Sequence, residues 1–133
     1  MTSDLRVVDA CALVALLSDA GPDGRWATEQ LDGHDLLAPA LCAFETANVL
    51  RRGEAAGRFG AASALAAHQA LLALPVQWCP YESLADRAWG LRADLSVSDA
   101  AYVALAELVD GPLVTLDRRL ARAPGVRCPV LTP

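Results

Sequence analysis

The sequence contains no lysine. All eleven basic residues are arginine, and sixteen acidic residues bring the formal net charge to −5. A broad basic surface, on which passive nucleic-acid binding depends, is therefore not expected. The acidic balance remains compatible with an enzyme in which bound cations reverse the charge of one small site.

Long apolar runs are also missing. No stretch approaches the roughly 20 apolar residues that a membrane-spanning helix requires. The first residues include Asp4 and Asp9, where a signal peptide would have a basic start and a long apolar segment. The sequence therefore predicts a cytoplasmic protein that makes no contact with a membrane.

Paired cysteine and histidine motifs are absent as well. The four cysteines form no CxxC pair and have no neighbouring histidine; they are Cys11, Cys42, Cys79 and Cys128. This pattern favours small buried thiols over disulfides or zinc ligands. Metal-free ribonucleases typically use paired histidines as acid and base. His34 and His68 fall on separate predicted elements, so we interpret both as structural or surface residues.

Apolar residues make up 54% of the 133 residues, which is enough for the core of one domain. Short, continuously apolar stretches predict strands at 5–10, 35–39, 76–80 and 111–117, with 126–131 as a possible closing edge strand. Helical spacing predicts helices at 11–19, 25–31, 41–54, 61–75, 82–95, 95–107 and 118–124. This alternation is typical of a parallel sheet covered on both faces. We predict a single α/β domain, residues 1–133, with three α/β/α layers around a mostly parallel sheet of four to five short strands.

Four acidic residues fall where such a fold binds ligands, near the carboxyl ends of its strands. Asp9 and Asp117 end two of the strands. Glu45 and Asp99 lie in the first turns of two helices. Gathered at one edge, four carboxylates would repel one another unless a cation lay between them. Mg²⁺ and Mn²⁺ prefer oxygen ligands of this kind, so the pattern predicts a divalent metal site.

Each acid alone also has a structural explanation. Ser96-x-x-Asp99 fits a capping box, and a carboxylate in a first turn is favoured by the helix dipole. Asp9 and Asp117 could be N-cap residues of the helices that follow them. Helix capping does not explain Glu45, for which the alternative is that it is a surface residue. A shared metal site explains all four acids.

Polar neighbours support the metal site. Asn48 and Arg52 follow Glu45 at spacings of three and seven residues, so the three share one helix face. Thr115 and Asp117 lie two apart on a strand and point the same way. We predict that Asn48 and Thr115 orient the metal ligands.

With these residues the sequence resembles the PIN-domain family, and in particular the VapC-type toxins of bacterial toxin–antitoxin pairs. The resemblance is carried by four segments in order, "VVDACALVALL", "FETANVLRR", "LSVSDAAYVALAE" and "LVTLDRRLA", which together span residues 7–121. It implies a metal-dependent endoribonuclease whose acidic quartet is Asp9, Glu45, Asp99 and Asp117. The family commonly has Ser or Thr two residues after the first aspartate, where this chain has Cys11. We expect activity to survive this change because that hydroxyl is not one of the four ligands.

The mechanism expected from this resemblance is hydrolysis of RNA by a metal-activated water, with Mg²⁺ or Mn²⁺ as cofactor and with 5′-phosphate and 3′-hydroxyl products. Asp9 and Asp99 are the first-choice direct ligands. Arginines that follow two of the motifs are candidates for phosphate contacts, although a solvated face explains each of them equally well. They are Arg51, Arg52, Arg118, Arg119 and Arg122.

The implied partners are an RNA substrate, a small cognate antitoxin and a second copy of the chain. The apolar helix at 61–74, together with Trp26 and Trp89, is the predicted contact for the antitoxin or the second copy. Core packing is the alternative explanation for the two tryptophans.

Two other function classes can be compared with this prediction. Receiver domains and haloacid-dehalogenase-type phosphatases also gather acids at strand ends, but both use a lysine, which this chain lacks. Such phosphatases also have a second aspartate where Ala10 and Cys11 follow Asp9 here. A PIN-like module that binds without chemistry remains the main alternative, and RNA cleavage with Mg²⁺, with EDTA and after Asp9→Asn separates the two.

Overall fold

The apolar stretches assemble into one parallel sheet. In the computed structural model, which describes residues 4–133, the strand order is β3-β2-β1-β4-β5 and each neighbouring pair is parallel. The strands are β1 (Leu5–Val8), β2 (Asp35–Pro39), β3 (Val76–Cys79), β4 (Leu113–Val114) and β5 (Val130–Leu131). The predicted parallel sheet and its closing edge strand are therefore confirmed. The first three residues of the predicted domain span, 1–133, lie outside the described residues.

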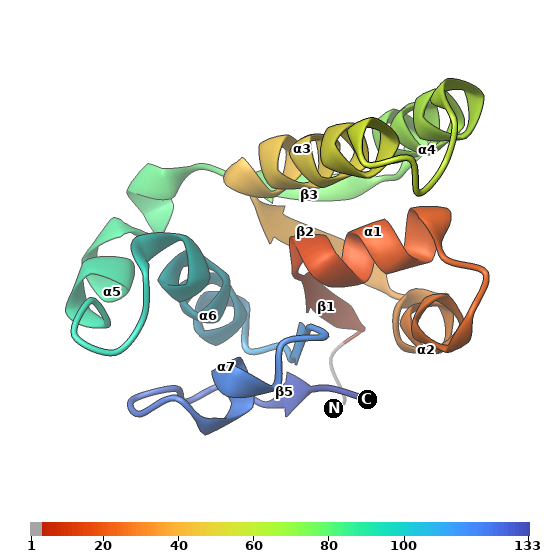
Figure 1. Cartoon of the computed structure of the whole chain (residues 1–133). Coiled ribbons are helices and arrows are strands. Elements are labelled where there is room, and N and C mark those ends of the chain that lie inside the picture. Colours follow the sequence, from red (N-terminus) through yellow and green to blue (C-terminus); the bar gives the residue numbers. More distant parts are fainter. Residues whose placement is uncertain (1–3) are drawn as a thin grey trace.

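Helices connect the strands and cover both faces of the sheet (Figure 1). Helices α1 and α2 lie on one face and α5 and α6 on the other, while α3 and α4 form a pair packed on α1. The helices are α1 (Ala10–Ser18), α2 (Pro22–Leu31), α3 (Leu41–Ala55), α4 (Ala61–Ala73), α5 (Ala85–Gly90), α6 (Val97–Val109) and α7 (Arg118–Arg122). The three-layer α/β/α prediction is confirmed. Among residues 4–133, no helix combines the length and apolarity needed to cross a membrane.

Three predicted elements differ from the structure, and one of them is the closing strand, predicted at 126–131, which pairs only at Val130–Leu131. The long helix predicted at 82–95 is instead a 3₁₀ turn (Tyr81–Ser83), the short helix α5 and a series of turns, because Gly90, a residue that disfavours helix continuation, ends α5. The strand predicted at 111–117 pairs only at Leu113–Val114. Strand β4 is short for two reasons. Pro112, which precedes it, has no N–H to donate, and Asp117, which follows it, already caps α7.

The core explains why the acidic segments meet. Val7 and Val8 of β1 are fully buried because this central strand is covered by helices on both faces. Helix α6 is buried over residues 100–106, where small alanines allow it to pack closely against β1, β2 and β4. As a result, the end of β1, the end of β4 and the first turn of α6 lie together at the carboxyl edge of the sheet.

The two tryptophans assigned to a partner surface do not join α4. Trp26 is partly buried and packs against the core. Trp89 is exposed on α5, at the opposite end of the molecule from α4 (Figure 1), with the Arg92 guanidinium 4.7 Å from its ring centroid. Core packing, the alternative explanation, therefore holds for Trp26, whereas Trp89 is exposed at a distance from α4, and the predicted partner contact of helix 61–74 stays a prediction.

Candidate functional site

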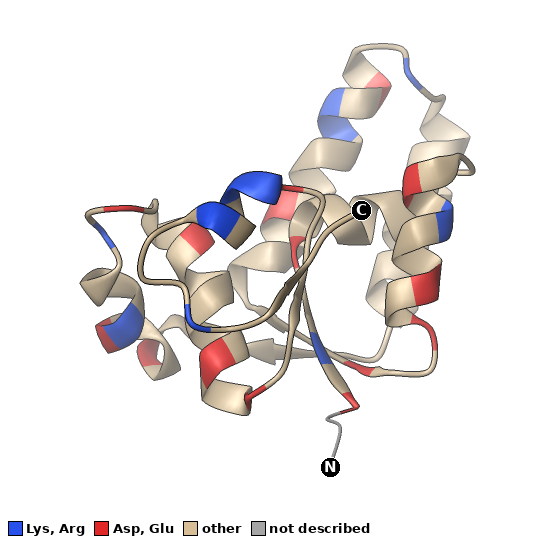
Figure 2. Cartoon of the chain, turned by 90° about the horizontal axis from the view of Figure 1, so that it is seen from below, with Lys and Arg blue, Asp and Glu red and all other residues tan. Residues whose placement is uncertain are grey.

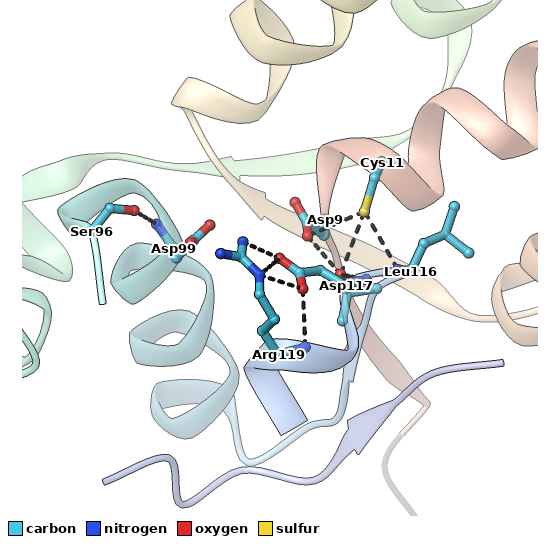
Figure 3. Close-up of polar contacts among 8 residues, drawn as sticks. Asp9, Cys11, Ser96, Asp99, Leu116, Asp117 and Arg119 are labelled. Carbon is cyan, nitrogen blue, oxygen red and sulfur yellow. Dashed lines mark hydrogen bonds and ion pairs between the residues drawn. The ribbon is translucent and has the colours of Figure 1, made fainter. Parts of the chain in front are cut away.

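The four predicted acids gather at the carboxyl edge of the sheet. Asp9 follows β1 directly, and Asp117 comes after β4, while Glu45 and Asp99 lie near the starts of α3 and α6. The charges of Asp9 and Asp99 both act on Glu45, and those of Asp9 and Asp117 both act on Asp99. In Figure 3, Asp9, Asp99 and Asp117 face one another from three separate segments. The structure thus brings together residues that are up to 108 positions apart in the sequence (117 minus 9).

Asp9 is held by two neighbours. The Thr115 hydroxyl donates a hydrogen bond to Asp9 Oδ2 at 2.7 Å, and the Cys11 thiol donates to the same oxygen at 3.3 Å. The Leu116 N–H donates to Cys11 Sγ at 3.4 Å. Burial, with the nearby charge of Asp9, raises the pKa of Cys11 to about 11, so the thiol stays protonated and able to donate.

Helix capping does not account for Asp9. It occupies the N-cap position of α1, yet its side chain makes no capping hydrogen bond. Asp117 does cap α7, because its carboxylate accepts from the Arg119 backbone N–H. At α6, Ser96 Oγ accepts from the Asp99 N–H at 3.1 Å, which is one half of the predicted capping box.

Glu45 accepts a hydrogen bond from the Tyr102 hydroxyl at 2.5 Å. Burial is the main cause that raises the pKa of Glu45; the Tyr102 hydrogen bond opposes this rise, and the charges of Asp9 and Asp99 add to it. Tyr102 is not among the site residues predicted from the sequence. A buried tyrosine normally needs a partner for its hydroxyl, and Tyr102 is only 1% exposed. The signal in the sequence that could have identified Tyr102 is its position one helical turn after Asp99.

Asn48 and Thr115 have different surroundings. Thr115 is fully buried and bridges the acids, because its hydroxyl oxygen also accepts from the Asp117 N–H at 3.0 Å. Asn48 is exposed, and its Oδ1 accepts from Arg51 Nε at 2.9 Å. Asn48 and Arg51 line a shallow depression on α3 together with Glu45. The hydrogen bond that Asn48 makes is therefore to Arg51, and the predicted contact of Asn48 with a metal ligand is not seen among the described residues.

The Asp117 carboxylate is engaged by Arg119. Arg119 Nε lies 3.0 and 3.2 Å from the two carboxylate oxygens, and a terminal guanidinium nitrogen lies 2.6 Å from Oδ2. These hydrogen bonds lower the pKa of Asp117. For Asp99 the direction is opposite, because burial raises its pKa and the charges of Asp9 and Asp117 raise it further, with Arg119 only partly opposing them.

The remaining candidate arginines are exposed. Arg119 and Arg122 line a cleft of about 460 Å³ beside Asp99, together with Asp94 and Ser96. Arg52 lies in the last turn of α3, and Arg118 begins α7. The basic residues form short separate groups among acidic ones (Figure 2), as the absence of a broad basic surface predicts.

Comparison with known proteins agrees with this geometry. The family described as "PIN domain" matches residues 6–126. This chain belongs to the PIN-domain family. Ribonuclease VapC9 of Mycobacterium tuberculosis (strain ATCC 25618 / H37Rv) is 42% identical over 125 residues, covering 93% of this chain and 94% of that protein. Ribonuclease VapC12 of the same strain is 35% identical over 119 residues, covering 90% and 92%.

A solved toxin–antitoxin complex from Klebsiella pneumoniae contains a chain of similar structure. The TM-score is 0.66 at 21% identity, and the match covers 96% of this PIN domain and 97% of that chain. At this identity the likeness shows the fold, and it agrees with the three-layer architecture described above.

The donor set of this PIN domain fits a hard divalent cation. Its candidate ligands are all carboxylates, and burial with mutual repulsion raises the pKa of Glu45 and Asp99. Within residues 4–133, no three or more His, Cys, Asp or Glu side chains are arranged to hold an ion as they stand. Metal binding by the quartet therefore remains a prediction that requires side chains to rearrange.

All four cysteines, which lie within the described residues, are free thiols. Cys42 is buried, as expected for a small apolar residue, whereas Cys11 also takes part in the hydrogen bonds of the site. Both histidines are partly exposed, and His34 contacts the backbone of Asp4 through Nδ1 at 3.2 Å.

Proposed function

We propose that this PIN domain is a Mg²⁺- or Mn²⁺-dependent endoribonuclease and the toxin of a toxin–antitoxin pair. The observation that carries the proposal is the convergence of Asp9, Glu45, Asp99 and Asp117 at one sheet edge, where their charges act on one another. Its sequence relatives VapC9 and VapC12 are named as ribonucleases, which supports the reaction class.

The acids would hold the cation, with Asp9 and Asp99 as direct ligands and Glu45 and Asp117 completing the site directly or through water. When bound, a divalent cation polarises a water molecule and a phosphate oxygen. Thr115 and Cys11 keep the Asp9 carboxylate in position, and Tyr102 does the same for Glu45. Glu45 or Asp117 would help to orient the attacking water. That water would add to phosphorus and lose a proton, the bond to the 3′ oxygen would break and that oxygen would take up a proton, so that a 5′-phosphate and a 3′-hydroxyl result.

RNA would be held by the arginines around the acids. Arg52, Arg118 and Arg122 are exposed, and Arg51, which donates to Asn48, lines the same shallow depression as Glu45. Guanidinium groups bind phosphate oxygens with two parallel hydrogen bonds, so a few of them suffice where a broad basic surface is lacking. The four free thiols agree with action in a reducing compartment, and we place the activity in the cytoplasm.

Protein partners would use the apolar surface formed by α3, α4 and β3. Phe44, Leu72 and Trp78 are 79%, 73% and 37% exposed there, and they line a cavity of about 300 Å³. Contiguous exposed apolar side chains of this size mark interaction sites. We assign this surface to a second copy of the chain or to the antitoxin, and the toxin–antitoxin assembly of the Klebsiella pneumoniae relative supports an antitoxin partner.

The test is cleavage of end-labelled RNA by the purified protein. With Mg²⁺ we expect internal cuts with 5′-phosphate ends, which EDTA abolishes and excess Mg²⁺ restores. Asp9→Asn, which keeps the side chain's size, should lower the rate by roughly 100-fold or more, because a metal ligand supplies several kcal/mol. Asp86→Asn, on the surface of α5, is the matched control. Cleavage that persists in EDTA or in Asp9→Asn would defeat the mechanism, and metal-dependent RNA binding without cleavage would favour the binding module.

A further inference from the structure

Arg119 donates four hydrogen bonds to the Asp117 carboxylate. One comes from its backbone N–H at 3.0 Å and three from its guanidinium at 2.6–3.2 Å. The two residues lie only two positions apart at the start of α7, so the pair closes locally and joins no distant parts of the chain. One carboxylate of the quartet is therefore already neutralised by a cation that belongs to the protein.

The guanidinium also acts on a second acid. The Arg119 side chain extends between Asp117 and Asp99 (Figure 3), and its positive charge interacts with both. It therefore occupies the side of Asp117 that faces the rest of the quartet. A divalent cation shared by Asp117 and the other acids would compete with this guanidinium for the same oxygens.

The surroundings allow the Arg119 side chain to move away from Asp117. Its side chain is 78% exposed, whereas that of Asp117 is 25% exposed. The cleft of about 460 Å³ beside it, lined by Ser96, Asp99 and Arg122, offers room for a long side chain. Because exposed ion pairs are only weakly stabilising, exchange of Arg119 for a divalent cation would be easy.

We propose that Arg119 is a built-in competitor of the divalent cation at Asp117. It neutralises Asp117 when no metal is bound and moves away when metal binds, so it sets the metal affinity of the site. The moved guanidinium stays at the same edge, beside Arg122, where an RNA phosphate is its available anion. This inference rests on the proposed metal-dependent function.

The experiment is calorimetric titration of MnCl₂ into the full chain without RNA. Arg119→Gln should bind Mn²⁺ roughly three- to fivefold more tightly than the unchanged chain, because the competing ion pair is gone. Arg122→Gln removes the same charge from the same helix without touching Asp117, and we expect it to stay within twofold. Arg119→Lys, which keeps the charge but loses the planar fork, should fall between the unchanged chain and Arg119→Gln.

A second arm tests the route through Asp117. In an Asp117→Asn background the Arg119→Gln change should no longer alter Mn²⁺ affinity by more than twofold. Equal affinities for Arg119→Gln and Arg122→Gln would overturn the inference while leaving the nuclease proposal intact. An Arg119→Gln effect that keeps its full size in the Asp117→Asn background would overturn it in the same way. Absence of Mn²⁺ binding in every variant would instead overturn the proposed function itself.

Discussion

Among residues 4–133, two arginine–carboxylate pairs of nearly equal length have different surroundings. Arg87 of α5 and Glu107 of α6 lie 2.7 Å apart at their closest nitrogen and oxygen, and Arg119 and Asp117 lie 2.6 Å apart. Arg87 also donates to the Gly125 carbonyl at 2.6 Å, and the Arg127 N–H donates to Glu107 at 3.1 Å. The first pair therefore joins three segments of the chain, whereas the second lies within one turn.

The difference separates a pair that stabilises the fold from one that is available for exchange. Burial raises the pKa of Glu107, but the hydrogen bonds from Arg87 and from the Arg127 N–H outweigh it, so the net pKa is lowered. At the acidic edge, burial and like charges leave the pKa of Glu45 and Asp99 raised. A fold selected for stability alone would not keep that repulsion, which points to a functional use of the acids.

The largest expected effect comes from Asp99→Asn. This substitution removes a charge that Asp9 and Asp117 repel, so the folded state should be as stable as before or slightly more stable. RNA cleavage should fall by roughly 100-fold or more, because a metal ligand is lost. Initial cleavage rates with Mg²⁺ and a thermal melt of the same preparation measure both. A rate within threefold of the unchanged chain would remove Asp99 from the site.

For Glu107→Gln we expect stability to fall while RNA cleavage is kept, the opposite of the result expected for Asp99→Asn. The change weakens the contacts to Arg87 and Arg127 and should lower the free energy of unfolding by about 1–2 kcal/mol, a charged hydrogen-bond contribution reduced for partial exposure. Cleavage measured under folding conditions should remain within twofold. Urea unfolding gives the stability. A stable variant that had lost cleavage would contradict the division into structural and functional pairs.

The pH dependence of stability tests the structural role of the Arg87–Glu107 pair. Because the pKa of Glu107 is lowered in the folded state, its contribution to stability is complete above the unfolded pKa of about 4.3 and is lost as pH falls through the folded value. The stability difference between the unchanged chain and Glu107→Gln should therefore be full at neutral pH and shrink in more acidic solution. Urea unfolding of both proteins along a pH series checks this. A difference independent of pH would show that the charge of Glu107 contributes nothing.

The smallest effect is expected for Cys11→Ser. A hydroxyl donates to Asp9 more strongly than a thiol and can also accept from the Leu116 N–H, so the network around Asp9 is kept. Cleavage should change by less than about threefold and the free energy of unfolding by less than about 1 kcal/mol. Cys11→Ala, which removes both contacts, should have the larger effect on each. Equal results for the two variants would show that the thiol only fills space.

Most of the fold was predictable because its signals are local. The strands at 35–39 and 76–80 and the helix at 41–54 follow from short apolar runs and helical spacing, and each is found within one residue of its predicted bounds. The helix predicted at 82–95 was wrong because α5 ends at Gly90, a residue that disfavours helix continuation, and the chain then turns. Helical periodicity over that stretch carries no information about such a turn.

The sequence by itself determined most of the elements, that the sheet is parallel, and that Asp9, Glu45, Asp99 and Asp117 stand near strand or helix ends at its carboxyl edge. Only the tertiary structure decided the partners of these acids. Tyr102 reaches Glu45 across 57 positions and Thr115 reaches Asp9 across 106. The physical reason is that local patterns set the backbone of each element, whereas a side-chain hydrogen bond depends on how elements from distant parts of the chain pack together.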